Sequence, residues 1–156
     1  MKAEYANPFV LAAVQTFQKE IGVKLSRKDL KLKDSPVPGQ EISVIIGVTG
    51  AVRGQVVLSL DDNVALAVAK AMLPGKVPAE LKKLVNSAVS ELANIITGQA
   101  SILLAGDTGH IDITPPAIIS GPGMRMDFLT MQTIALTFLS EIGQFELNIA
   151  LTEGAV

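Results

Sequence analysis

The longest uninterrupted pattern in the sequence starts near Pro78 and runs towards Ala105, and it predicts a single long helix. At about 100° per residue, the bulky apolar side chains of this segment gather in one broad stripe. That stripe consists of Val85, Val89, Leu92, Ile96 and Leu103, flanked by Leu81, Ala88 and Ile95. A stripe of this width is buried in a stable protein, so the segment predicts a core helix.

The opposite side of the same helix is polar. It holds Glu80, Lys83, Ser87, Glu91, Asn94, Gly98 and Ser101. Glu91 and Asn94 lie three residues apart and point the same way. Asn is a mediocre helix former, and Gly in a helix interior costs about 1 kcal/mol relative to Ala, but Gly lets another backbone approach closely. These features favour a docking face, although a Glu and an Asn at this spacing also occur by chance on ordinary helix surfaces.

A second helix is predicted near the N-terminus, from Asn7 to Val23, because its apolar residues recur at helical spacing. Asn7 is the expected N-cap, with Pro8 at the first helical position and Gly22 beyond the end. The lysine-rich stretch from Lys24 to Gln40 that follows is interpreted as a solvated loop or an edge strand.

A hairpin is predicted next, because Ile42 to Val48 and Gly54 to Leu60 are two β-branched runs joined by a short connection. Asp61 and Asp62 then precede a helical segment from Val64 to Met72. The two carboxylates could be proposed as metal ligands. Capping of the helix, together with a favourable interaction with its dipole, explains them with fewer assumptions.

More strands are predicted after the long helix. They run over Ile111 to Ser120, Met124 to Thr130, Ile134 to Ser140 and Phe145 to Leu151. The connections between them are short, which favours antiparallel pairing. Residues 1–156 are therefore expected to form a single α+β domain, a mostly antiparallel β-sheet with helices packed on it.

The composition excludes several classes of function. The net charge is −2 and no basic stripe exists, which argues against nucleic acid and anionic membranes as partners. Cysteine is absent, so disulfides and thiolate metal sites are excluded. No segment approaches the ~18 uninterrupted apolar residues of a membrane span, and we expect a cytoplasmic protein. The single histidine, His110, is interpreted as an ordinary, partly exposed side chain, and no metal site is predicted.

The polar helix face also resembles a known signature. The string Ser87-Ala-Val-Ser-Glu91-Leu-Ala-Asn94-Ile-Ile-Thr-Gly98, with Pro115 and Pro116 downstream, is similar to the motif of the CheC/CheX/FliY chemotaxis phosphatases. The similarity extends over nearly the whole chain and implies a CheC-like fold. CheC-type members carry the Glu and Asn on two helices, whereas the first predicted helix here has no such pair. The resemblance is therefore to the CheX kind, which implies one site per chain and a homodimer.

The resemblance also implies a reaction, the hydrolysis of the aspartyl phosphate of a phosphorylated CheY-like response regulator. In that reaction Asn94 would orient the attacking water, and Glu91 would pair with the regulator's phosphate-contacting lysine. Ser87 would sit at the edge of the contact, and Gly98 would leave room for it. No cofactor of the chain's own is expected, because Mg²⁺ would belong to the partner receiver domain.

Two other functions remain open on the sequence. The first is a non-catalytic adaptor that binds a receiver domain or a flagellar switch component. An adaptor would have no need of the Asn94 amide. The second is a purely structural dimerisation module, which would explain the apolar composition but not the polar, glycine-containing helix face.

Overall fold

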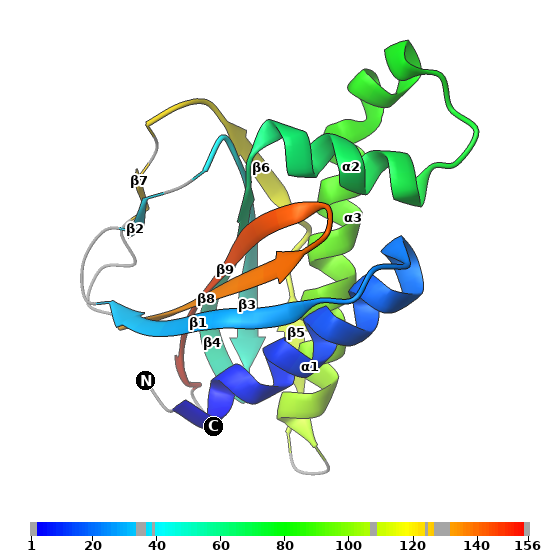
Figure 1. The fold of residues 1–156 in the computed structure, drawn as a ribbon. Helices are drawn as coiled ribbons and strands as arrows, with labels where there is room; N and C mark the ends of the chain where they lie inside the picture. The colour runs from blue at the N-terminus through cyan, green and yellow to red at the C-terminus, as the bar shows by residue number, and fades with distance from the viewer. Residues whose placement is uncertain are drawn as a thin grey trace.

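The computed structural model describes residues 3–33, 37–38, 40–106, 109–123, 125–126 and 132–154. A sheet and three α-helices, α1 (Ala6–Thr16), α2 (Asp62–Met72) and α3 (Pro78–Ala105), make up the described fold (Figure 1). Its larger sheet is antiparallel throughout, and the helices pack on it, which confirms the predicted α+β class. Tight turns explain the two hairpins, residues 42–60 and 133–153, because a tight turn can join only antiparallel neighbours.

The sheet has seven strands in the order β1-β8-β9-β4-β3-β5, with β6 also paired to β3. Their bounds are β1 (Ser26–Lys33), β3 (Ile42–Gly50), β4 (Val52–Leu60), β5 (Ile111–Ile113), β6 (Ala117–Ser120), β8 (Thr133–Ser140) and β9 (Gly143–Glu153). A separate pair of two-residue strands, β2 (Val37–Pro38) and β7 (Arg125–Met126), lies outside this sheet.

Of the lysine-rich segment from Lys24 to Gln40, Ser26–Lys33 form β1, which lies at one edge of the sheet and pairs with β8, while residues 34–36 and 39 lie outside the described residues. This confirms the edge-strand interpretation over the loop. Most of its side chains are exposed, and exposed lysines on an edge strand oppose pairing with further strands.

The predicted strand from Ile111 to Ser120 is two strands, because Pro115 and Pro116 lie between β5 and β6 and have no N–H to donate. Both short strands pair with β3. Between them, the Thr114 N–H donates to the Gly47 carbonyl at 2.9 Å, and the Gly47 N–H donates to Thr114 Oγ1 at 2.8 Å. Of the predicted strand from Met124 to Thr130, Arg125–Met126 is a strand and the remainder lies outside the described residues.

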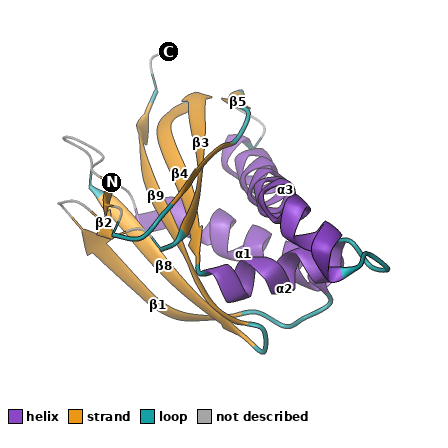
Figure 2. Cartoon of the chain, turned by 90° about the horizontal axis from the view of Figure 1, so that it is seen from above, coloured by secondary structure: helices purple, strands orange, loops and turns teal. Residues whose placement is uncertain are grey.

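The three helices lie on one face of the sheet, as Figure 2 shows. Between the helices and the sheet is a core made mostly of Val, Ile, Leu and Ala. Three phenylalanines stack in it: the ring centroid of Phe145 lies 4.8 Å from that of Phe17 and 5.2 Å from that of Phe138. Aromatic stacking joins the end of the first helical segment to β8 and β9.

The predicted cap of α2 is confirmed. Asp61 has an extended backbone, and its Oδ1 accepts a hydrogen bond from the Val64 N–H at 2.8 Å. The Asp62 N–H donates to Glu41 Oε2 at 2.7 Å. The hydrogen bond from Val64 to Asp61 supports the capping interpretation of this pair. Among the described residues, no group of three or more His, Cys, Asp or Glu side chains could hold a metal ion.

The predicted cap of α1 is wrong. A 3₁₀ turn, Ala3–Tyr5, runs directly into the helix, so α1 begins at Ala6 and Asn7 already lies in its first turn. The preceding backbone is helical and continues the hydrogen-bonded turns, so no side-chain cap is needed there. The predicted end is correct: a π-helical turn, Phe17–Ile21, stops at Gly22, which has a φ of 79°.

Candidate functional site

The helix α3 forms one continuous scaffold for the predicted site. It packs against α1 and α2 and against strands β3 and β5. Val89, Leu92 and Ile96 are fully buried, which confirms the predicted core stripe. Leu103 is an exception, because it is 46% exposed, while Ala100 and the partly buried Leu104 contact the core at that end. A helix fixed along most of its length presents its outer side chains in a rigid arrangement.

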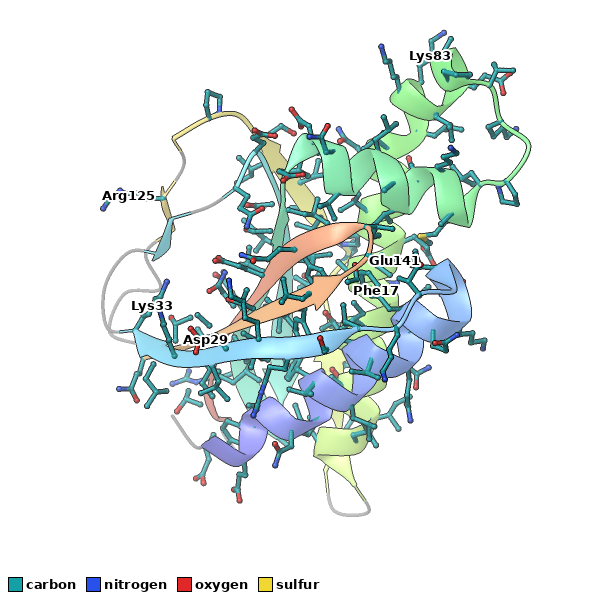
Figure 3. All side chains as sticks on the ribbon, in the orientation of Figure 1. Phe17, Asp29, Lys33, Lys83, Arg125 and Glu141 are labelled. Carbon is teal, nitrogen blue, oxygen red and sulfur yellow. The ribbon has the colours of Figure 1, made fainter. Side chains whose placement is uncertain are left out.

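The four predicted site residues share the outer face of α3. Ser87 and Glu91 are exposed, and Asn94 and Gly98 are half-buried. Lys83 projects from the same helix near its N-terminal end (Figure 3). The arrangement presents a carboxylate and an amide, one helical turn apart, to an approaching surface.

The space beside Gly98 is open enough for a side chain. A Cβ built at this position would lie 4.0 Å from Cδ1 of Ile113, which is an ordinary van der Waals separation. The chain's own packing therefore does not require glycine here, although glycine weakens the helix by about 1 kcal/mol relative to alanine. That Gly98 makes room for another molecule stays a prediction.

Ser101 was predicted to lie on the exposed polar face of the helix, but it is buried. It is only 5% exposed, and it lies near β5, since Ser101, Ile111 and Ile113 line the same pocket. Its Oγ has no hydrogen-bond partner in the described part of the chain. The helical pattern alone could not reveal this, because the strand that covers Ser101 follows the helix in the sequence.

A pocket of about 350 Å³ lies between these last turns and β5. Its lining includes Gly98, Ser101 and Ile102 from the helix and His110, Ile111 and Ile113 from the strand region. The sequence pattern did not predict this pocket. The one available signal was Ile102, an apolar residue that falls on the polar side of the helical pattern.

His110 lies at the rim of this pocket, and its Nε2 lies 2.9 Å from Oδ1 of Asp112. Both side chains are largely exposed. The contact is thus a surface pair, which fits the interpretation of His110 as an ordinary side chain rather than a general base.

Length and apolar composition alone would allow α3 to cross a membrane. In the structure, 44% of its most apolar window is buried inside the protein. A helix in the core of a globular protein satisfies the same two criteria, so this feature is weak support for a membrane span.

Comparison with known proteins identifies the family. The family model described as "Chemotaxis phosphatase CheX" matches residues 42–139, which is more than half of the chain and includes all of α3. The chain belongs to the CheX family. This confirms the resemblance seen in the helix motif and the downstream prolines.

Known CheX proteins resemble the chain over almost its whole length. The CheY-P phosphatase CheX of Thermotoga maritima is 28% identical over 156 residues, which cover 99% of both chains. The crystal structure of CheX from Vibrio vulnificus has a TM-score of 0.82 and 28% identity, covering 96% of this chain and 100% of that one. The CheX–CheY–BeF3–Mg²⁺ complex from Borrelia burgdorferi gives a TM-score of 0.77 at 28% identity, covering 97% and 100%.

Proposed function

We propose that this CheX-family protein hydrolyses the aspartyl phosphate of a phosphorylated CheY-like response regulator. The observation that carries the proposal is the outer face of α3, where exposed Glu91 and half-buried Asn94 stand beside the open position of Gly98. The name of the Thermotoga maritima relative, a CheY-P phosphatase, supports the reaction class. The complex of the Borrelia burgdorferi relative with CheY supports the class of partner.

The reaction requires little covalent chemistry from this chain. Phosphoryl transfer depends mainly on positioning and on electrostatic stabilisation. The Mg²⁺ and lysine of a receiver domain offset the charge on the phosphoryl oxygens, so a helper protein can contribute an attacking water in line with the leaving aspartate. The Mg²⁺ in the Borrelia burgdorferi complex supports its assignment to the partner. We assign no cofactor to this chain.

Asn94 is suited to hold that water. Its side-chain amide both accepts and donates hydrogen bonds, so it can orient a water molecule. It is also uncharged, so it brings no repulsion next to a phosphate. Because α3 is packed along its length, the amide reaches the partner from a fixed position.

Glu91 has a docking role in this mechanism. Its carboxylate is exposed one turn before Asn94 and pairs with the regulator's phosphate-contacting lysine. Ser87 lies at the edge of the contact, and Gly98 allows the regulator's backbone to approach the helix.

Substitution of Asn94 tests the chemistry. Asn94→Ala should lower the stimulated rate of dephosphorylation by about 100-fold or more, because an unpositioned water reacts slowly. The measurement is the loss of phosphate from a phosphorylated CheY-type receiver domain with Mg²⁺. Asn86→Ala is the control, since Asn86 is an exposed asparagine elsewhere on α3. A rate near that of the wild type for Asn94→Ala would disprove the positioned-water role.

Substitution of Glu91 tests docking. Glu91→Gln keeps the shape and removes the charge, so the affinity for a beryllofluoride-activated receiver should fall by about tenfold, as expected when one charged hydrogen bond is lost. Titration calorimetry measures this affinity, with Glu80→Gln on the N-terminal turn of the same helix as the control. Equal affinity of the Glu91 variant and the wild type would contradict the assignment.

The adaptor function makes a different prediction in the same assays. An adaptor binds the activated receiver but leaves the rate of phosphate loss unchanged. Binding without acceleration would therefore select the adaptor, and the Asn94 amide would then have no chemical role.

We also infer that residues 1–156 form one CheX-like domain that works as a cytoplasmic homodimer with two sites. The likeness to CheX proteins over nearly their whole length supports the single domain. Light scattering tests the assembly, and a monomeric mass at micromolar concentration would contradict the homodimer.

A further inference from the structure

The pocket between the last turns of α3 and β5 has no role in the proposed chemistry. Three isoleucines, Ile102, Ile111 and Ile113, contribute to its lining together with Gly98 and Ser101. Its volume of about 350 Å³ equals that of roughly twelve water molecules in the liquid. An apolar occupant would therefore displace several waters from aliphatic walls, which is favourable.

Two residues of the pocket are unexplained by the chain's own packing. Ile102 is 68% exposed, more than any other large apolar side chain identified as exposed in the described residues. Ser101 has the opposite defect, because its Oγ is buried without a hydrogen-bond partner in the described residues. A small side chain at this position keeps the pocket open, whereas a larger one would occupy it. The exposure of Ile102 suits a surface that is completed by another molecule. Ser101 contributes only its small size, because an apolar occupant forms no hydrogen bond with its Oγ.

The pocket is continuous with the outer face of α3 that carries Glu91 and Asn94. Glu91, Asn94, Gly98, Ser101 and Ile102 fall within an arc of about 100° on the helix, at 3.6 residues per turn. Gly98 belongs to both, since it lines the pocket and lies one turn after Asn94. Ile102 follows Asn94 by about 12 Å along the axis, at about 1.5 Å per residue.

A partner protein that binds at Asn94 is also large enough to contact Ile102. A specific protein interface buries about 800 Å² on each side, equivalent to a disc with a radius of about 16 Å. A disc centred on Asn94 therefore includes Ile102 and the mouth of the pocket. Along the helix axis, the pocket begins about 6 Å from Asn94, at Gly98, and reaches about 12 Å at Ile102.

We propose that an apolar side chain of the receiver domain inserts into this pocket while Asn94 reaches the phosphorylated aspartate. The inference rests on the proposed function and adds a second contact site, which sets affinity and partner choice but not chemistry. The spacing along α3 places the inserted side chain on the receiver surface about 6 to 12 Å from the point that Asn94 contacts. Buried apolar anchors of this kind carry much of the energy of small interfaces.

A matched pair of variants on neighbouring residues tests the pocket. Ile102→Glu places a charge at the pocket, whereas Leu103→Glu places the same charge on another face of the same turn, where Leu103 is 46% exposed. Ile102→Glu should raise the KM for the phosphorylated receiver about tenfold and leave kcat within about twofold, as expected for a hot-spot contact. Leu103→Glu should change neither constant. Ile102→Ser and Leu103→Ser repeat the comparison without added charge.

Three results would overturn the proposal. The first is an equal rise in KM for the Ile102 and Leu103 variants, which indicates a general effect of surface change. The second is a loss of kcat at unchanged KM in Ile102→Glu, which places Ile102 in the chemistry. The third is a change in the light-scattering mass of Ile102→Ser, which indicates that the pocket holds a second copy of this chain.

The proposed function can fail separately from the pocket. If the wild-type protein does not accelerate phosphate loss, titration with the beryllofluoride-activated receiver still compares the two pairs of variants. A selective loss of affinity in the Ile102 variants then supports the pocket in an adaptor. If the wild-type protein neither hydrolyses nor binds the receiver, both proposals are wrong.

Discussion

At the scale of single residues, three features that the fold does not explain lie on one side of α3. Gly98 weakens the helix, although a methyl group would fit beside it. Ile102 is exposed although it is apolar, and Ser101 is buried without a partner in the described part of the chain. Residues that break local rules without benefit to folding concentrate at functional sites.

Gly98→Ala separates stability from docking. The free energy of unfolding should rise by about 1 kcal/mol, because alanine is the better helix former and its Cβ meets no close atom. The KM for the phosphorylated receiver should rise at the same time, because the methyl group stands where the partner approaches. Urea unfolding and steady-state kinetics measure the two effects. If the variant is more stable but its KM is unchanged, Gly98 has no role in binding the receiver domain.

At the scale of elements, local signals predicted where most helices begin and end. The carboxylate of Asp61 caps α2, and Gly22 ends the first helical segment in a left-handed conformation. Asn7 failed as a cap because the upstream 3₁₀ turn supplies backbone groups that its side chain would otherwise replace. Capping residues are thus good predictors only where the chain before the helix is extended.

Asp61→Ala should lower the free energy of unfolding by about 1 kcal/mol, because the Val64 N–H loses its acceptor. Asp61→Asn should keep most of the stability, since asparagine caps nearly as well. Thermal unfolding compares the two variants. The kcat for phosphate loss should stay at the wild-type value in both, because α2 carries none of the proposed site residues. An equal loss for both variants would show that capping is not the role of Asp61.

At the scale of the whole molecule, the sheet decides which parts of the chain meet at the site. The strand order places β5 and β6 beside β3, although β3 and β5 are separated in sequence by β4, α2 and α3. This pairing brings Ile113 to Gly98 and forms the second wall of the pocket. The end of α3 and the strand β5 are separate in the sequence, but together they form one surface.

The sequence by itself determined the α+β class, the long helix with its buried stripe, and the outer face that carries Ser87, Glu91, Asn94 and Gly98. These depend on periodicity and on local turn chemistry, which act between residues close in the chain. Tertiary structure decided the strand order, the burial of Ser101 and the pocket at Ile102. The burial of Ser101 and the pocket need β5 to lie against the end of α3. Helical periodicity shows that one face of a helix is buried, but it does not show which distant segment packs against the helix.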